Sequence, residues 1–239
     1  MCGIFFSLST SGSVLPTEET CCLLRQRGPD SFQVHTVQRD TQGASEDKKG
    51  GHSEAAITAH LTFISTVLSL RGDHVHTQPL VDEASQSVLC WNGEAWKVAG
   101  QPVQDNDTEL IFRLFLQVVR SSSSEPGSAD AVQRLADLIS SISGPFSFVF
   151  YDAFNSKVFF SRDCLGRRSL LQGTDDTGDL RICSLCDGTS SSPFEEVDTD
   201  GMHMIDLASA ASISEIKNLP WTYEENNASA NHLVRGSRP

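Results

Sequence analysis

The sequence predicts an α+β protein in which antiparallel sheets carry helices on their outer faces. Segments typical of strands come before, between and after the expected helices, without the regular strand–helix alternation of a parallel sheet. Phenylalanine recurs at every second position from Phe146 to Phe150, which is the period of a strand. Asn155 and Ser156 favour a tight turn into a second strand, so these two strands are expected to pair antiparallel.

The first half of the chain is expected to place one helix between strands. Cys2–Leu8 is mostly apolar and predicts a short buried strand at the start. A helix covers about Thr17–Arg27 and ends at Gly28-Pro29, because glycine is common just beyond a helix and proline cannot continue one. The polar, Gly-rich stretch Thr41–Glu54 predicts a surface insertion. Two further strands are expected, at Ala55–Val67 and Ser87–Trp91.

The most regular pattern in the chain predicts a helix over Asn106–Arg120. Its apolar side chains form one continuous stripe, at Leu110, Ile111, Leu114, Phe115, Val118 and Val119. Asn106 and Glu109 resemble a capping box at its start. A linker over Ser121–Asp130 is expected to lead into a short helix at Ala131–Ile142. The second strand of the later strand pair is expected at Lys157–Ser161. Beyond Asp187 the pattern is weak, and about the last fifteen residues are expected to be disordered.

The composition argues against several classes of protein. The 239 residues carry a net charge of −13, which disfavours nucleic acid or an anionic membrane surface as a partner. No apolar run approaches the roughly 18–20 residues that span a bilayer, and the start of the chain lacks the basic segment of a signal peptide. Seven cysteines, an odd number, do not suit a secreted disulfide framework. A reducing, cytoplasmic compartment is therefore expected.

Cys2 is the first residue with an evident chemical capacity. Its small side chain permits removal of Met1, which would leave a thiol and a free α-amino group on one residue. Free thiols have a pKa of about 8.5 and α-amines a pKa of about 7.7–8.0, so Cys2 would supply both a nucleophile and a matched base. N-terminal threonine nucleophiles work by the same principle. A cysteine at position 2 is usually accidental, so its meaning depends on the rest of the chain.

Five motifs occur in order along the chain. They are Met1-Cys-Gly-Ile4, Arg25-Gln-Arg-Gly-Pro-Asp-Ser31, Trp91-Asn-Gly-Glu94, Asn106-Asp-Thr-Glu-Leu-Ile111 and Arg162-Asp-Cys-Leu-Gly-Arg-Arg-Ser-Leu-Leu171. Over about Met1–Leu207, this set resembles the class II (N-terminal nucleophile) glutamine amidotransferase domain of asparagine synthetases. Arg-Gly-Pro-Asp and Asn-Gly-Glu are similar to asparagine synthetases rather than to amidotransferases of purine, glucosamine or glutamate synthesis. The resemblance implies a four-layer αββα sandwich of two antiparallel sheets, with Cys2 at a strand end between the layers.

The resemblance also implies an enzyme that hydrolyses glutamine to glutamate and ammonia for asparagine biosynthesis. Cys2 would attack the side-chain amide of L-glutamine while its own α-amine takes the thiol proton, and a γ-glutamyl thioester would form. The side chain of Asn92 and the backbone N–H of Gly93 would provide the oxyanion hole. Losing one such donor typically slows an enzyme about 10²–10³-fold. Taken alone, Asn92-Gly93 is better explained as a hairpin turn.

Three residues are expected to hold the α-groups of the substrate. The resemblance assigns Glu94 and Asp107 to the α-ammonium, and Asp107 could cap the start of its helix at the same time. Arg71 is chosen for the α-carboxylate because guanidinium groups suit carboxylates and no other arginine is near. The position of Arg71 departs from the family pattern, because it lies only seven positions before Gln78, whereas the family arginine usually lies about a dozen residues before the Gln-Pro-Leu motif. The segment Asn-Gly-Glu-Ala-Trp-Lys97 departs as well, since asparagine synthetases usually continue Asn-Gly-Glu with Ile-Tyr-Asn. Three further motif residues are expected to be structural: Arg27, Arg162 and Asp163.

The expected domain plan is an amidotransferase domain over 1–207 followed by a linker or disordered tail over 208–239. No Ser-Gly-Gly-x-Asp-Ser loop is present, so the ATP-binding synthetase domain is taken as absent, and no cofactor is expected in this chain. ATP and magnesium would belong to a synthetase domain, present in cis or in trans as a partner. Two hypotheses remain: an active glutaminase, or a binding or regulatory module that keeps the fold with weak or no turnover.

No metal site is expected. Cys183 and Cys186 have CxxC spacing, yet no second pair follows at the spacing of a zinc site. Four histidines fall in one stretch where no helix would align them, at His52, His60, His74 and His76. A redox or zinc protein built on the two cysteines is the third hypothesis, and it would require bound metal or a reversible disulfide.

Overall fold

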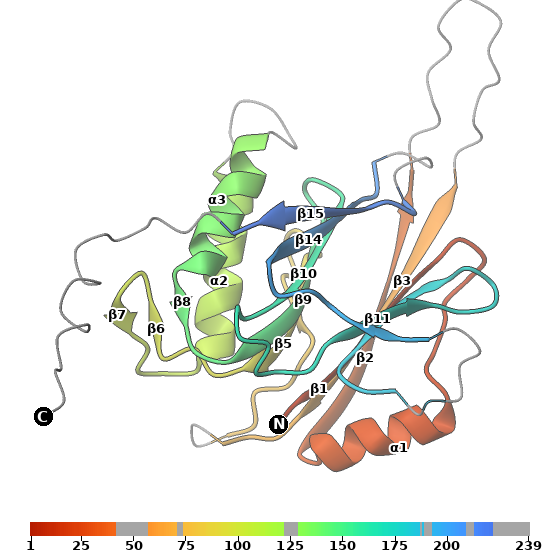
Figure 1. Ribbon diagram of the computed structural model, residues 1–239, viewed down its shortest axis with the longest axis horizontal. Helices are drawn as coiled ribbons and strands as arrows, with labels where there is room; N and C mark the ends of the chain where they lie inside the picture. The colour runs from red at the N-terminus through yellow and green to blue at the C-terminus, as the bar shows by residue number, and fades with distance from the viewer. Residues whose placement is uncertain are drawn as a thin grey trace, which may run out of the picture.

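The computed structural model describes residues 1–41, 57–70, 74–121, 129–186, 188, 193–208 and 213–221. Within these residues the chain forms two six-stranded sheets, a three-stranded sheet and three helices (Figure 1). Every pairing between the strands is antiparallel, and the two large sheets pack against each other. One helix covers the outer face of the first large sheet and two helices cover the outer face of the second. The predicted α+β fold, a four-layer αββα sandwich, is confirmed.

The first large sheet carries the start of the chain at its centre. Its strands, in spatial order, are β13 (Glu195–Glu196), β11 (Leu171–Thr174), β12 (Leu180–Cys183), β1 (Gly3–Ser9), β3 (Thr58–Val67) and β2 (Ser31–Asp40). Every residue of β1 is buried, because neighbouring strands flank it and layers of side chains cover both of its faces. The residue that precedes β1 is thereby held at the end of a fixed central strand.

The second large sheet supplies the opposite wall. Its strands, in spatial order, are β15 (Ile216–Pro220), β14 (Gly201–Asp206), β10 (Lys157–Arg162), β9 (Phe146–Asp152), β5 (Val88–Gly93) and β4 (Leu80–Val81). The alternation predicted in β9 is confirmed: Phe146, Phe148 and Phe150 face the helices, while Val149 and Tyr151 face the first sheet. β5 ends at Gly93, beside Phe146 of β9.

The remaining elements close the outside of the sandwich. They are the small sheet of β7 (Gln101–Pro102), β6 (Lys97–Val98) and β8 (Ile142–Ser143), and the helices α1 (Glu18–Arg27), α2 (Asp107–Arg120) and α3 (Ala129–Ser140). Asn106 caps α2 as predicted, because its side chain accepts a hydrogen bond from the N–H of Glu109 at 3.2 Å. The apolar stripe of α2 packs on the phenylalanines of β9, with Phe115 5.4 Å from Phe148 between ring centres.

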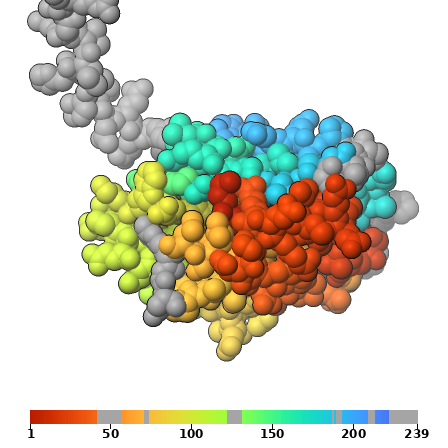
Figure 2. Space-filling view, turned by 90° about the horizontal axis from the view of Figure 1, so that it is seen from below, coloured from red at the N-terminus to blue at the C-terminus, as the bar shows by residue number. Residues whose placement is uncertain are grey.

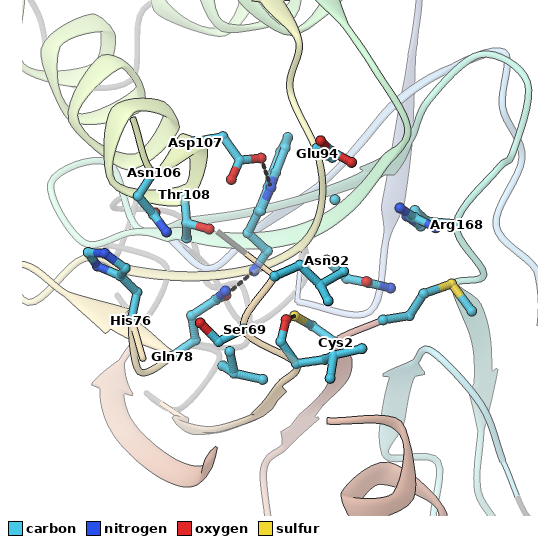
Figure 3. Close-up of a pocket in the computed structure, with 16 residues that line it drawn as sticks. Cys2, Ser69, His76, Gln78, Asn92, Glu94, Asn106, Asp107, Thr108 and Arg168 are labelled. Atoms are coloured by element: carbon cyan, nitrogen blue, oxygen red, sulfur yellow. Dashed lines mark hydrogen bonds between the residues drawn. The ribbon is translucent and has the colours of Figure 1, made fainter. Parts of the chain in front are cut away.

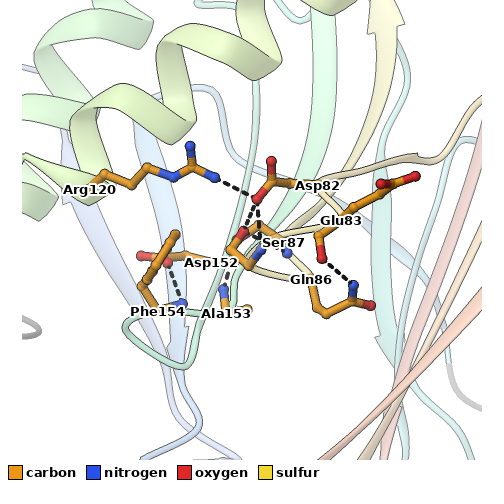
Figure 4. A network of polar contacts seen from close by, with 9 residues as sticks. Asp82, Glu83, Gln86, Ser87, Arg120, Asp152, Ala153 and Phe154 are labelled. Carbon is orange, nitrogen blue, oxygen red and sulfur yellow. Dashed lines mark hydrogen bonds and ion pairs between the residues drawn. The ribbon is translucent and has the colours of Figure 1, made fainter.

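A polar network fixes the strand turn that leads into β5 (Figure 4). Asp82 accepts hydrogen bonds from the N–H and hydroxyl of Ser85, and from Arg120 at the end of α2. The hydroxyl of Ser87 accepts a hydrogen bond from the N–H of Ala153, after β9, at 3.1 Å. The end of α2 and two strand connections are thus joined, which holds β5 in register with its neighbours.

Three sequence expectations differ from the structure. The helix expected to reach Ile142 ends at Ser140, because Ile142 pairs with Val98 in the small sheet. The sheet continues past residue 207, where the domain was expected to end, since β15 at Ile216–Pro220 pairs with β14. Several strands were not predicted, among them β2, β11, β12, β14 and β15. Most of the expected insertion at Thr41–Glu54, most of the linker after Ser121 and all of the last fifteen residues lie outside the described residues.

Candidate active site

Cys2 opens onto a cavity of about 210 Å³ at the end of the sandwich. The cavity is lined by the start of the chain, the segment after β3, the end of β5, the first turn of α2 and a residue from the segment before β11 (Figure 3). In Figure 2 the start of the chain is visible at the surface, between segments from both halves of the sequence. The volume is below the roughly 300–1,000 Å³ of drug-sized ligand sites, so the cavity suits a small ligand such as one amino acid.

The Cys2 thiol is half-buried and held beside the backbone. Its sulfur lies 3.9 Å from the carbonyl oxygen of Leu68. Burial raises the pKa of this thiol above its ordinary value, and the nearby carboxylate of Asp107 acts in the same direction. Burial also lowers the pKa of the α-amino group of Met1, one residue away. Both shifts favour the neutral forms of the two groups, and an uncharged amine can accept the thiol proton once that amine belongs to Cys2 itself.

Gly3 lets the first helix approach this end of β1 closely. A Cβ atom at Gly3 would lie 2.6 Å from the hydroxyl of Thr66 and 2.8 Å from a methyl group of Leu24. That hydroxyl donates a hydrogen bond to the Leu24 carbonyl at 2.8 Å, which fastens α1 to β3. The glycine after Cys2 therefore has a packing reason, since a Cβ atom there would force the side chain of Thr66 or Leu24 to move.

Asn92 and Gly93 lie at the end of β5, where the sequence predicted the oxyanion hole. Asn92 is 1% exposed, and its side-chain Nδ2 is buried with no hydrogen-bond partner among the described residues. Leaving such a donor unpaired costs about 1–3 kcal/mol, so a buried donor that faces a cavity indicates a ligand acceptor. Gly93 pairs with Phe146, and a Cβ atom there would lie 2.8 Å from Phe146 Cβ and from the Pro145 carbonyl. Both residues line the cavity beside Cys2.

Asp107 joins the first turn of α2 to the segment after β5. Its Oδ2 accepts hydrogen bonds from the indole N–H of Trp91 at 3.0 Å and the backbone N–H of Ala95 at 2.8 Å. The Trp91 backbone N–H donates to the side chain of Gln78 at 2.7 Å, which fixes the strand from its other side. Asn106 caps the helix, so Asp107 instead orients the segment that carries Asn92 and Gly93.

Two predicted substrate-binding residues remain, Glu94 and Arg71, and the structure describes only the first. Glu94 lines the same cavity, next to the oxyanion candidates. Arg71 lies outside the described residues. The cavity therefore brings together five of the six predicted site residues: Cys2, Asn92, Gly93, Glu94 and Asp107.

The three motif residues expected to be structural have the contacts of structural residues. Arg27 donates to the hydroxyl of Ser169 at 2.9 Å and to a backbone carbonyl. Arg162 forms an ion pair with Glu196 at 2.8 Å and also holds backbone carbonyls of the turn that follows it. Asp163 forms an ion pair with Arg167 at 2.8 Å and accepts from the N–H of Phe146. These contacts fix the turn at 163–168 against β9.

Several cavity residues were not predicted from the sequence. Gln78 anchors β5, and His76 lies 3.0 Å from a carboxylate oxygen of Glu109. Arg168 brings a positive charge into the cavity from the second half of the chain. The Gly-Arg-Arg motif contained the signal for Arg168, but two adjacent arginines give no indication of which one faces the site.

The described residues contain no cluster of three or more side chains that could hold a metal ion, and all the cysteines are free thiols. The part of the chain that the structure describes has no helix with the length and apolar character of a membrane span.

Comparison with curated proteins finds relatives over almost the whole chain. The chain is 31% identical to asparagine synthetase domain-containing protein 1 of Bos taurus, over 99% of this chain and 34% of the relative. The protein of that name from Gallus gallus is also 31% identical, over 94% of this chain and 32% of the relative. Asparagine synthetase (glutamine-hydrolyzing) of Rattus norvegicus is 25% identical, over 83% and 32%. The chain thus spans about a third of the length of these relatives. No protein-family model matches it.

Comparison with solved structures finds the same fold in two enzymes. Glutamine phosphoribosylpyrophosphate amidotransferase from B. subtilis, complexed with ADP and GMP, has a TM-score of 0.59 at 16% identity, over 93% of this chain and 50% of that chain. A structure described as the allosteric regulatory enzyme of purine biosynthesis has a TM-score of 0.56 at 16% identity, with the same coverage. At this identity the likeness concerns the fold alone.

Proposed function

The chain belongs to the asparagine synthetase-like proteins and has the fold of an N-terminal nucleophile glutamine amidotransferase, and from this premise we propose that it hydrolyses glutamine through Cys2. The observation that carries the proposal is the buried Nδ2 of Asn92, which finds no hydrogen-bond acceptor in the described part of the chain and lies in one small cavity with the Cys2 thiol. An amide donor at that point is suited to an oxyanion that exists only during the reaction.

The first half of the reaction forms a thioester. After Met1 is removed, the α-amine of Cys2 accepts the thiol proton, and the sulfur attacks the side-chain carbonyl carbon of glutamine. The carbonyl oxygen becomes negative and accepts hydrogen bonds from Asn92 Nδ2 and the N–H of Gly93. The C–N bond then breaks, ammonia leaves with the proton returned by the α-ammonium, and a γ-glutamyl thioester remains on Cys2.

The second half releases glutamate. A water molecule gives a proton to the α-amine and attacks the thioester carbon, and the same two donors stabilise the second oxyanion. The C–S bond breaks, the sulfur regains its proton, and glutamate leaves. Because burial keeps the pKa of the thiol high, Cys2 is neutral at pH 7 and depends on a base held beside it.

Substrate recognition follows from the charges that line the cavity. Glu94 and Asp107 are proposed to receive the α-ammonium of glutamine, and Asp107 also holds the oxyanion segment through Trp91 and Ala95. Arg71 remains the proposed ligand of the α-carboxylate. The ammonia is proposed to serve asparagine formation in a synthetase domain, which would require ATP and magnesium and could lie in cis or in trans.

The test is glutamate release from millimolar glutamine by the purified chain, after intact mass has confirmed loss of Met1. Turnover is expected, with its loss in Cys2→Ala and its retention in Cys22→Ala, which alters an exposed cysteine of α1. No turnover from correctly processed protein would sink the proposal and favour a binding module with the amidotransferase fold.

A further inference from the structure

Arg168 is a charged residue of the cavity that the reaction described above does not use. It lies in the turn before β11 and lines the cavity with Cys2 and Glu94 (Figure 3). Its neighbour Arg167 is occupied elsewhere, in an ion pair with Asp163 and a contact of its guanidinium with the ring of Trp96. Of the two adjacent arginines, Arg168 alone lines the cavity that contains the nucleophile.

The backbone of Arg168 is held in place by a buried network. Arg162, which is 5% exposed, donates a hydrogen bond from Nε to the Arg168 carbonyl at 2.9 Å and another to the Gly166 carbonyl at 2.6 Å. The next residue, Ser169, accepts a hydrogen bond from Arg27 of α1. The backbone that carries the Arg168 side chain is therefore held in place.

The Arg168 side chain has no acidic partner within the described residues. The ion pairs there take up Arg120, Arg162, Arg167 and Arg181, and the Nε of Arg168 is buried without a hydrogen-bond acceptor. An arginine placed only for stability would be expected to meet a carboxylate or a carbonyl group. Because Arg168 lines the cavity, its charge acts on the groups around Cys2.

The charges around Cys2 explain what such a cation would do. Asp107 from the start of α2 and Glu94 after β5 line the cavity, where a negative charge favours a substrate ammonium but disfavours a thiolate. On the positive side are the α-amino group at the chain start, Arg27 of α1 and Arg168, and His76 also lines the cavity. Arg27 keeps its charge in its hydrogen bonds to Ser169 and a backbone carbonyl, but it does not line the cavity, whereas Arg168 does.

We infer that Arg168 is a positioning residue whose charge stabilises the Cys2 thiolate against the carboxylates that hold the substrate ammonium. This inference rests on the proposed nucleophilic role of Cys2. The effect of Arg168 on nearby pKa values has the direction that this role requires. The charge of Arg168 lowers the pKa of the Cys2 thiol and also the pKa of the adjacent α-amino group. A thiol that ionises more readily and an amine that stays neutral both favour attack.

The experiment measures alkylation of Cys2 by iodoacetamide against pH, in the processed protein without glutamine. The Cys2 peptide is quantified by mass spectrometry, and the exposed Cys22 serves as an internal control. The midpoint is the pH at which alkylation of Cys2 reaches half of its maximal rate. In Arg168→Gln this midpoint is expected to rise by about half to one pH unit, which is about a three- to tenfold loss of thiolate at fixed pH. The shift is smaller than that of a direct ion pair because no hydrogen bond joins the two side chains. Arg168→Lys keeps the positive charge, so its midpoint should lie close to that of the parent protein.

The control variant Arg113→Gln removes the same charge from an exposed position of α2 that does not line the cavity, and should leave the midpoint unchanged. An unmoved midpoint in folded Arg168→Gln overturns the inference. If that variant instead raises only the glutamine concentration needed for half-maximal turnover, Arg168 binds the substrate carboxylate and the inference is likewise wrong. Because alkylation needs no turnover, its outcome is separate from that of the glutaminase test.

Discussion

Replacing Asp107 separates its structural role from its proposed role in substrate binding. The change to alanine removes the one oxygen that accepts hydrogen bonds from both the Trp91 indole N–H and the Ala95 N–H. Trp91 is 1% exposed and Ala95 is fully buried, so neither donor can turn to bulk water. Asp107→Asn keeps an oxygen acceptor of nearly the same shape but removes the charge.

The magnitude follows from the two donors. Each buried donor left unpaired costs about 1–3 kcal/mol, and loss of a carboxylate from the first turn of a helix adds about 0.3–1 kcal/mol. We therefore expect Asp107→Ala to lower the free energy of unfolding by about 3–5 kcal/mol. Asp107→Asn should lose only about 1–2 kcal/mol, since a neutral acceptor makes weaker hydrogen bonds than a carboxylate.

The assay is equilibrium unfolding in urea at pH 7, followed by far-ultraviolet circular dichroism. Asp105→Ala is the matched control, because Asp105 is exposed two residues earlier and its loss should change stability by no more than about 0.5 kcal/mol. A cost below about 1 kcal/mol for Asp107→Ala, or equal costs for the alanine and asparagine variants, would show that the carboxylate does not hold the two donors. Asp107→Asn should also weaken glutamine binding, because the substrate ammonium loses a charged partner.

Three further predictions concern the oxyanion hole, the first strand and the core. Asn92→Ala should lower kcat about 10²–10³-fold with little change in KM, measured as glutamate release; an unchanged kcat would remove Asn92 from the oxyanion hole. Gly3→Ala should destabilise the protein by about 1–3 kcal/mol in urea, because its Cβ would meet Thr66 and Leu24, and a neutral result would mean that α1 shifts freely. Burial raises the pKa of Cys90 from 9.0 to about 12, so its contribution to stability is complete below pH 9 and declines by about 1.4 kcal/mol per pH unit above it. Cys90→Ala should therefore lose less stability than the parent protein between pH 8 and 10, and parallel declines would contradict the assignment.

Periodic elements could be predicted well from the sequence. The stripe of α2 and the alternating phenylalanines of β9 were recognised because each is apolar along one face, and that face packs on the other element. The strand β2 was missed because it lies at a sheet edge, where all of its side chains are half-buried or exposed and need not be apolar. The strand β15 was missed for the same reason, since all but one of its residues are exposed.

The candidate site was only partly accessible from the sequence. Motifs identified Cys2, Asn92, Gly93, Glu94 and Asp107 because they lie in short, recognisable segments. The second contact of Asp107, with Ala95, depends on how a loop returns over the helix start, and no local pattern records it. Arg168 reaches the cavity from a turn that precedes β11, so its placement depends on the packing of the two sheets.

The proposed mechanism requires that Cys2 become covalently attached to the glutamyl group. The direct measurement is rapid acid quenching of processed protein mixed with glutamine, followed by intact mass and mapping of the adduct by peptide mass spectrometry. We expect a γ-glutamyl thioester on Cys2 that hydroxylamine releases, that accumulates in the first turnover and that is absent from Cys2→Ala. Glutamate release without such an adduct, or an adduct that persists in Cys2→Ala, would contradict the proposed mechanism.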